Sequence, residues 1–453
     1  MNENPLNLDG EDMHTSETSA RLARPGSKTP DCDQEQGAAR PFERIASLIE
    51  KCRPGWTLPG QFYSDEAVYE ADVERIWRRG WLFAGHSCEI PQPGDYFTLA
   101  LDSDSLIVIR GEQGTLHGLH NVCRHRGSLI CAEAAGHAKT LVCPYHQWSY
   151  GLDGKLLACR GMQEELDRSQ LNLKKIHVRE IEGLIYLSLA GTPPEFEPAR
   201  QLLLPLAGQQ GFNRARVAKA IDYLVKANWK LIWENNRECY HCNRNHPQYI
   251  KANFDHYNAD DTPADIQRRI TAAVARSQTQ SAIAGLALTH KRAGMTSFPD
   301  AENNLWFSAN RTPLAEGYVT ESLDGKQVAP LMGDYKEPEV GTLRMRTLPN
   351  FWNHSSCDHA VSTRLLPAGP QLTAVRVCWL VNEQAVAGRD YQLADLLPFW
   401  QLTSEQDWAI CERQQRGVNS TAYTPGPYST YKETNVDNFV RWYLKQVSSG
   451  SRA

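Results

Sequence analysis

Hydrophobic positions along the chain change their spacing near Trp81, and this change separates two kinds of predicted element. Between Pro41 and Trp81 apolar residues recur at helix-like intervals, which predicts a helical segment over 41–80. Short runs rich in β-formers follow, separated by Gly and Asp turns, and these predict strands at Tyr96–Leu101, Ser105–Arg110, Leu116–Leu119, Thr140–Val142, Gln147–Tyr150 and Leu184–Leu189. The pattern is typical of a small antiparallel β domain, which we assign to 81–195.

From about residue 205 onward helical and strand patterns mix, and we assign 205–446 to a second domain. Helices are expected at Asn228–Cys242 and Gln392–Gln415, and the polar stretch 257–290 predicts a helix or a lid. Strands of a second sheet are predicted at Phe351–His354 and Gln371–Val381. The expected fold class is therefore α+β.

Composition narrows the class of protein further. The 453 residues carry a formal charge of −5, from 48 basic and 53 acidic side chains, which does not suggest a nucleic-acid groove or a polybasic membrane patch. No apolar run approaches the roughly 20 residues that span a bilayer. Residues 1–40 are polar and lack apolar periodicity, so we expect a disordered tail. The start, Met1–Gly10, does not resemble a secretory signal, so we expect a cytoplasmic protein.

Cysteines and histidines gather in two short motifs within the predicted β domain. Cys123 and His125 form C-x-H, and after seventeen intervening residues Cys143 and His146 form C-x-x-H. Two such loops facing each other can hold a two-iron cluster, with the cysteines on one iron and the histidines on the other. Replacing two cysteines by histidines defines a Rieske [2Fe–2S] centre. Gly127 is expected to allow close backbone approach beside these ligands.

A structural zinc site is the alternative for these four side chains. Zinc sites usually pair like with like, as C-x₂₋₄-C and H-x₃₋₅-H, whereas each motif here mixes the two ligand types. The spacing of the twelve cysteines shows no small-domain disulfide framework. Cysteines without histidine partners are interpreted as small core residues: Cys88, Cys131, Cys159, Cys357, Cys378 and Cys411. His117 and His120 are expected on a strand edge rather than on a metal.

A second cluster of metal-ligand types lies between residues 228 and 247. Glu238 and His241 are three residues apart, which would place them on one helix face. His246 lies about 140° further round an ideal helix and precedes Pro247, which disfavours helical geometry. The helix should therefore end after Cys242 and let the chain bend His246 back toward His241.

Two histidines and one carboxylate form the facial triad of non-haem Fe(II) oxygenases, with positions open for O₂. For the carboxylate we choose Asp407, on the predicted helix 392–415. Taken alone, this cluster could also be ordinary helix-surface histidines. Its occurrence on one chain with the first motif favours a mononuclear iron bound by His241, His246 and Asp407.

The two sites together resemble the Rieske oxygenase α subunits, also called ring-hydroxylating oxygenase large subunits. The likeness runs from about Pro54 to Tyr443 and rests on C-x-H-R-G at 123–127, C-P-Y-H at 143–146 and E-x-x-H-x-x-x-x-H at 238–246. It implies a Rieske antiparallel β domain followed by a helix-grip catalytic domain, in a head-to-tail homotrimer. It further implies that a bridging carboxylate, Glu238, joins a cluster histidine of one subunit (His146) to an iron histidine of the next (His241).

One departure from the family pattern bears on the substrate. Most members have Asp at the bridging position, whereas this chain has Glu238. A Glu in this setting looks like the branch of glycine betaine demethylases, carnitine monooxygenases and stachydrine demethylases. A permethylated ammonium would contact aromatic faces. The candidates in the second domain are Trp229, Trp233, Trp306, Phe307, Phe351, Trp352 and Trp400.

The resemblance implies a multicomponent monooxygenase that uses O₂ and demethylates a small quaternary ammonium substrate. No G-x-G-x-x-G follows a predicted strand, so a separate NAD(P)H-dependent reductase of flavin and ferredoxin type must supply electrons. Three alternatives stay open at this point. They are an aromatic ring-hydroxylating α subunit, a Rieske electron carrier, and a non-catalytic zinc-binding module.

Overall fold

The computed structural model describes residues 41–257, 262–283 and 298–449, so the expected tail at 1–40 lies outside the described residues. The first described segment is helical, as predicted. It contains α1 (Pro41–Ile49), the 3₁₀ turn η1 (Gly60–Tyr63), α2 (Glu66–Asp72) and the π-helical turn η2 (Val73–Trp77). Asp65 caps α2, because its side chain accepts a hydrogen bond from the backbone N–H of Ala67 at 2.9 Å.

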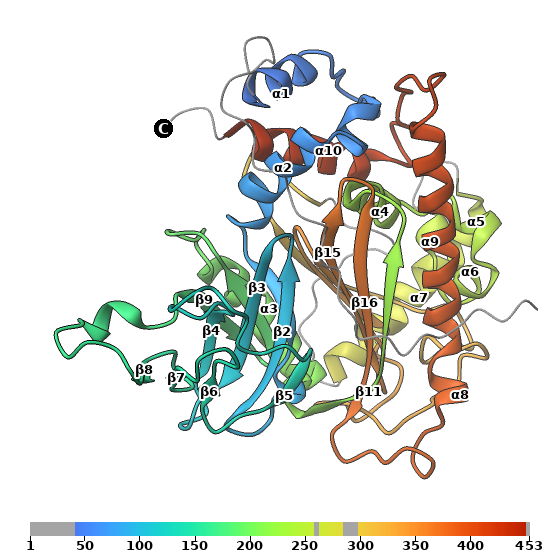
Figure 1. Cartoon of the computed structure of the whole chain (residues 1–453). Helices are drawn as coiled ribbons and strands as arrows, with labels where there is room; N and C mark the ends of the chain where they lie inside the picture. Colours follow the sequence, from blue (N-terminus) through green and yellow to red (C-terminus); the bar gives the residue numbers. More distant parts are fainter. Residues whose placement is uncertain (1–40, 258–261, 284–297, 450–453) are drawn as a thin grey trace, which may run out of the picture.

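A seven-stranded antiparallel sheet follows and forms the body of the N-terminal half (Figure 1). Its strand order is β1-β10-β9-β4-β3-β2-β5. The strands are β1 (Leu82–His86), β2 (Asp95–Leu101), β3 (Asp104–Arg110), β4 (Leu116–His120), β5 (Ala135–His137), β9 (Lys175–Ile181) and β10 (Leu184–Ser188), with η3 (Ser87–Glu89) and η4 (Arg168–Leu171) between them. His117 and His120 lie on β4, as expected.

A small second sheet is inserted between β5 and β9. It consists of β6 (Leu141–Val142), β7 (Ser149–Tyr150) and β8 (Leu156–Ala158), which pair in that order. In Figure 1 this sheet lies at the lower left, on the opposite side of the molecule from the long helix α9 (Pro398–Val418).

The C-terminal half is built on a six-stranded antiparallel sheet with the order β11-β16-β15-β14-β13-β12. The strands are β11 (Ala215–Val225), β12 (Phe307–Thr312), β13 (Thr342–Thr347), β14 (Phe351–Ser355), β15 (Ala360–Gly369) and β16 (Leu372–Asn382). The two faces of β13 differ in chemistry, because side chains alternate along a strand. Leu343 and Met345 join a core cluster with Leu203 and Leu206 of α3 (Glu197–Gln210). Arg344 and Arg346 therefore face the other side of the sheet.

Helices surround this six-stranded sheet (Figure 1). They are α3 (Glu197–Gln210), α4 (Trp229–Asn236), α5 (Cys242–Asn245), α6 (Pro247–Ala252), α7 (Ala264–Ile283), α8 (Leu393–Leu396), α9 (Pro398–Val418) and α10 (Thr434–Ser448), with η5 (Phe212–Arg214) and η6 (Asp255–Tyr257) between them. The α+β fold class predicted from the sequence is confirmed. Within the described ranges, no helix is long and apolar enough to cross a membrane.

The predicted helix 228–242 is wrong in its last third. It ends at Asn236, and Arg237 to His241 form an irregular turn before α5. A local hydrogen-bond pattern competes with the helix here, since the Glu238 carboxylate accepts from the backbone N–H groups of Tyr240 and His241. Helix α7 agrees with the helix predicted in 257–290, as far as that stretch is described.

Candidate metal centres and substrate cavity

Two loops with matching backbone geometry carry the first candidate centre. In one, the N–H of Gly127 donates to the carbonyl of Cys123 at 3.0 Å; in the other, the N–H of Gln147 donates to the carbonyl of Cys143, also at 3.0 Å. Both donors have positive φ, +76° at Gly127 and +58° at Gln147. Glycine adopts this left-handed backbone without steric cost, which favours it at Gly127. A Cβ there would meet no protein atom within 4 Å, so the close approach to a cluster stays a prediction.

The four side chains differ in exposure by type. Cys123 and Cys143 are buried, whereas His125 is half-buried and His146 is exposed. The two imidazole rings lie with their centroids 4.6 Å apart, and His125 stacks on Trp148 at 4.8 Å. The Nδ1 atom of His125 is buried and has no hydrogen-bond partner in the described part of the chain. A buried ring nitrogen left unpaired beside two thiols fits a metal cluster held between the loops.

Charge and dipoles at the loops favour a thiolate. Burial raises the pKa of the Cys143 thiol, but the N–H groups of Tyr145 and His146 and the neighbouring Cys123 outweigh it, so the net shift is downward. The pKa of His146 is lowered by desolvation and by nearby His125 and Arg126, which keeps the ring neutral. Thiolate and neutral imidazole are the forms that bind iron.

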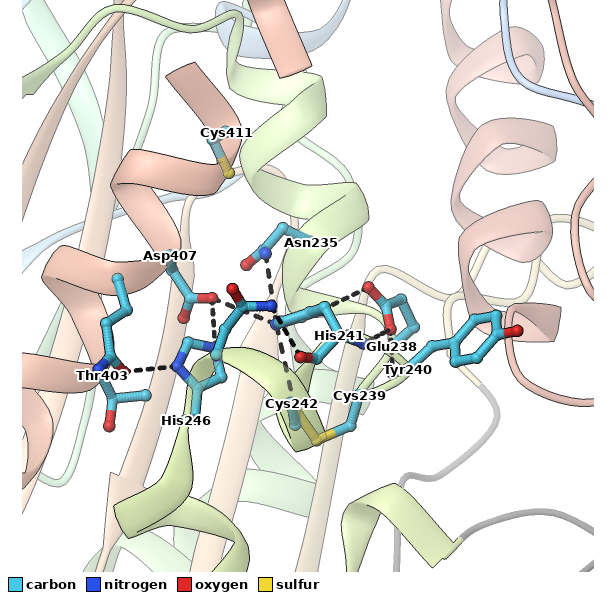
Figure 2. A network of polar contacts seen from close by, with 12 residues as sticks. Asn235, Glu238, Cys239, Tyr240, His241, Cys242, His246, Thr403, Asp407 and Cys411 are labelled. Atoms are coloured by element: carbon cyan, nitrogen blue, oxygen red, sulfur yellow. Dashed lines mark hydrogen bonds and ion pairs between the residues drawn. A yellow bond between two sulfur atoms is a disulfide. The ribbon is translucent and has the colours of Figure 1, made fainter. Parts of the chain in front are cut away.

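The second candidate centre brings together three side chains that the sequence separates by up to 166 positions (Figure 2). The Nε2 atoms of His241 and His246 lie 3.3 and 2.9 Å from the same oxygen, Oδ1 of Asp407. His246 has the non-helical backbone expected before Pro247, with φ −126° and ψ 66°, and Asp407 projects from α9. The carboxylate faces both rings.

Hydrogen bonds on the far side of each ring determine which nitrogen is free. Nδ1 of His241 lies 2.5 Å from Oε1 of Glu238, and Nδ1 of His246 lies 2.8 Å from Oε1 of Gln406. Both oxygens are acceptors, so both Nδ1 atoms carry a proton, and the Nε2 atoms are the ones that face Asp407. When the Nε2 atoms are deprotonated, they and the carboxylate converge on one point as three acceptors, and two imidazoles with one carboxylate fit Fe(II).

Without a metal, protons hold this arrangement together. Burial would lower the pKa of His241, but hydrogen bonds to Asp407 and Glu238 raise it to about 10. Burial raises and the two histidines lower the pKa of Asp407, with a net value of about 2. The carboxylate is thus ionised and ready to bind a cation.

A disulfide between Cys239 and Cys242 spans the loop that carries His241 (Figure 2). Sequence reasoning missed this bond, because it considered only a multi-cysteine framework, whereas a single C-x-x-C pair needs only a tight turn. The Sγ atom of Cys242 lies 4.0 Å from Nε2 of His241. A disulfide sulfur is not a thiolate, so Asp407 is the better third ligand.

A cavity of about 70 Å³ adjoins the triad. The three candidate iron ligands line one wall. Side chains from the six-stranded sheet line the opposite wall, including Arg344, Arg346, Trp352, His354, Val361 and Thr363. Aromatic side chains contribute much of the surface: Tyr249, Trp352, Trp400 and Trp408. Of the aromatic candidates chosen from the sequence, Trp352 and Trp400 line the cavity, whereas Trp229, Trp233 and Phe351 are packed in the core.

Comparisons with known proteins agree with this geometry. Residues 212–449 match the family described as ring hydroxylating alpha subunit (catalytic domain), and residues 80–176 match the Rieske [2Fe–2S] domain. A glycine betaine monooxygenase oxygenase subunit from Chromohalobacter salexigens is 40% identical over 419 residues, which are 92% of this chain and 91% of the relative. The chain belongs to the ring-hydroxylating α-subunit family of Rieske oxygenases. This family assignment confirms an oxidoreductase with a Rieske [2Fe–2S] cluster and a mononuclear iron.

Other relatives of this Rieske oxygenase are more distant. A carnitine monooxygenase oxygenase subunit from Acinetobacter baumannii is 30% identical over 202 residues, 43% of this chain and 53% of that protein. The crystal structure of a quaternary ammonium Rieske monooxygenase in complex with L-carnitine has a TM-score of 0.62 at 20% identity, covering 88% of this chain and 98% of that one. Naphthalene 1,2-dioxygenase from Rhodococcus, with indole bound, has a TM-score of 0.57 at 20% identity, covering 91% and 99%. These structures share the fold.

The family assignment decides between alternatives left open by the sequence. A Rieske oxygenase α subunit is neither a stand-alone electron carrier nor a zinc-binding module without catalysis. Sequence reasoning missed three further residues at the site: Gln406, which contacts His246, and Tyr249 and Trp408, which line the cavity. Gln406 had one available signal, because it directly precedes Asp407 on a helix and so can contact an adjacent ligand.

Proposed function

We propose that this chain is the oxygenase component of a Rieske monooxygenase that removes an N-methyl group from a betaine-like quaternary ammonium compound. The observation that carries the proposal is the 40% identity over 92% of the chain to a glycine betaine monooxygenase oxygenase subunit. The aromatic surfaces of Tyr249, Trp352 and Trp400 in the cavity support it, because a permethylated ammonium interacts favourably with aromatic faces and cannot donate a hydrogen bond.

Each metal group has a proposed set of protein ligands. The thiolates of Cys123 and Cys143 and the imidazoles of His125 and His146 would hold the [2Fe–2S] cluster. His241, His246 and Asp407 would hold the mononuclear iron. The cluster supplies single electrons, and the mononuclear iron supplies O₂ activation.

The remaining cavity residues position the substrate and control its surroundings. The aromatic wall holds the trimethylammonium group with one methyl toward His241, His246 and Asp407. Oxidation of that C–H bond consumes one O₂, two electrons and two protons, and yields the N-hydroxymethyl compound and one water. The N-hydroxymethyl group then loses formaldehyde and a proton, and the C–N electron pair stays on the tertiary amine.

Electron delivery is proposed to cross a subunit boundary in a homotrimer. The cluster loops and the iron site lie on opposite sides of one chain (Figure 1), so the cluster of one subunit serves the iron of its neighbour. The cluster loops present exposed apolar side chains for such a contact: Val122, Leu129, Val142 and Tyr145. Beside the iron site Tyr240 is 60% exposed, next to the Glu238 carboxylate that is bonded to His241. Glu238 would then bridge to His146 of the neighbour.

The partners and the division of the chain follow from the same proposal. Electrons come from NAD(P)H through a separate reductase of flavin and ferredoxin type. The Rieske domain is taken as 81–195 and the catalytic domain as 205–446. The cytoplasmic location stays a prediction.

A reconstituted assay tests the function. The purified chain, loaded with iron, is mixed with a surrogate reductase, NADH and either glycine betaine or benzoate. Formaldehyde released in proportion to betaine, together with the tertiary amine, is the expected result. Hydroxylated benzoate without formaldehyde would instead establish an aromatic ring-hydroxylating α subunit.

A further inference from the structure

Two buried arginines share the cavity-facing side of β13, and their surroundings differ. Arg344 donates to Oδ2 of Asp255 at 2.6 Å and to Oδ1 of Asn253 at 2.8 Å. The Asp255 carboxylate also accepts a hydrogen bond from Tyr249. Arg344 is therefore neutralised by a carboxylate inside the protein and acts as part of the wall.

Arg346, two residues further along, has no such partner. It is 2% exposed and lines the cavity, and its Nη1 donates a hydrogen bond to Oδ1 of Asn310 at 3.1 Å. Its Nε has no partner, and no carboxylate of the described residues forms an ion pair with it. The nearest carboxylate that acts on Arg346, Asp255, is already bonded directly to Arg344. A buried cation without a direct ion pair is costly unless a ligand supplies the negative charge.

The groups around Arg346 are also donors without acceptors. Across β12–β13 it is paired with Ser308, and Asn310 is paired with Arg344, so all four face the same side of the sheet. Nδ2 of Asn310 and Oγ of Ser308 are buried and have no hydrogen-bond partner among the described residues. Of these four side chains Arg344 and Arg346 line the cavity, and a carboxylate, with two oxygens and about four lone pairs, matches the guanidinium of Arg346.

Other charges at the cavity do not compete for that role. His354 is neutral at physiological pH, because burial lowers its pKa to about 4. Burial and the nearby Arg344 lower the pKa of Arg346 to about 10, so Arg346 stays protonated at neutral pH. Asp407 is directed at His241 and His246 on the opposite wall.

We propose that Arg346 binds the carboxylate of the substrate, so that the cavity selects a quaternary ammonium carboxylate over the corresponding alcohol. The inference rests on the proposed N-demethylase function and names the group that recognises the anionic end of the substrate. Arg346 projects from the sheet and the triad from the opposite wall. A zwitterion anchored at Arg346 therefore directs its methyl groups toward His241, His246 and Asp407, with Trp352, the cross-strand partner of Arg346, beside it.

The test compares two probes that share the trimethylammonium group. Glycine betaine carries the carboxylate, and choline carries a hydroxymethyl group in its place. Binding of each is measured by calorimetry to the iron-loaded protein under nitrogen, for the wild type and for Arg346→Met and Arg346→Lys. Arg346→Met keeps an unbranched stem as far as the position of Nε and removes the charged guanidinium, whereas Arg346→Lys keeps the charge and loses the planar fork.

Arg346→Met should weaken glycine betaine binding by about ten- to a hundredfold, the usual effect of losing charge-assisted hydrogen bonds, and leave choline binding within about twofold. Arg346→Lys should restore part of the loss. In turnover, the change should be in KM rather than kcat. The visible spectrum of the cluster and the iron content serve as folding controls for both variants.

The outcomes distinguish a failure of the proposed role of Arg346 from a failure of the demethylase function. Equal losses for betaine and choline in Arg346→Met would overturn the inference, because they would assign Arg346 to the shape of the wall. Wild-type betaine binding and turnover in that variant would also overturn it, while the demethylase function would stand. A wild-type protein that binds neither probe and releases no formaldehyde would overturn the function and the inference together.

Discussion

The Glu238→Gln variant addresses how the iron site is connected to its surroundings. In the structure both carboxylate oxygens of Glu238 act as acceptors. Oε1 accepts from Nδ1 of His241 at 2.5 Å, and Oε2 accepts from the backbone N–H groups of Tyr240 and of His241, the latter at 3.3 Å. A glutamine amide has one oxygen and one NH₂ group. Whichever way it is turned, a donor will face a donor.

The loss of one acceptor oxygen in Glu238→Gln sets the size of the expected effect on iron binding. One charge-assisted hydrogen bond is lost, which corresponds to about 1.5–3 kcal/mol. Groups that orient a metal-binding histidine typically change metal affinity or activity by about ten- to a hundredfold. We therefore expect Glu238→Gln to bind Fe(II) about ten- to a hundredfold more weakly and to slow electron transfer between subunits, with the Rieske spectrum unchanged.

Two measurements check this expectation. Iron retained after dialysis against a graded series of chelator concentrations gives the affinity. Rapid mixing of the reduced, substrate-bound protein with O₂ gives the rate at which the cluster absorption returns, measured at saturating Fe(II). Glu238→Asp is the control, because it keeps the charge and both acceptor oxygens on a side chain shorter by one methylene. Iron affinity and reoxidation rate equal to wild type in Glu238→Gln would refute the bridging role.

Three further perturbations test other parts of the structure. Asp407→Ala should strip the mononuclear iron and leave the Rieske spectrum intact, by metal analysis and visible absorption; loss of both groups together would contradict the ligand assignment. Lys230→Met leaves the fully buried Asp72 without its cation and should lower the free energy of unfolding by about 3 kcal/mol in a urea titration of cluster-loaded protein, with partial recovery when Asp72→Asn is added. In iron-free protein, the raised pKa of His241, about 10, contributes stability that is complete below about pH 6.5 and is lost as the pH rises toward 10. Thermal unfolding across this range should show the decline, and Asp407→Asn should reduce it; an unchanged slope would argue against the pairing.

The metal ligands could be predicted because each set is short in sequence or chemically distinctive. C-x-H and C-x-x-H mix ligand types within a few residues, so Cys123, His125, Cys143 and His146 were identified without knowledge of the turns that hold them. Asp407 could be chosen only because a facial triad lacks one member when two histidines are present. Its approach to the histidines depends on packing between α9 and the loop after α4, which no local pattern reports.

The parts that escaped prediction depend on contacts distant in sequence. Strand β13 alternates leucine or methionine with arginine, a pattern expected of a surface strand, yet both of its faces are buried. Its arginine face lines a cavity, so burial of Arg344 depends on Asp255, 89 positions away. The end of α4 was misplaced for a local reason, because the Glu238 side chain captures backbone N–H groups that a longer helix would have used.

The unequal exposure of the cluster loops has a consequence for how the enzyme behaves at different concentrations. His146 is exposed, and the small sheet β6–β8 beside the cluster loops lies across the molecule from α9, which carries Asp407 (Figure 1), so an isolated subunit would store an electron with no acceptor in reach. In the proposed homotrimer, turnover per chain should therefore fall on dilution as the subunits separate. The turnover rate per chain would then depend on protein concentration only because concentration determines how many subunits are assembled into trimers, with no change in either metal centre.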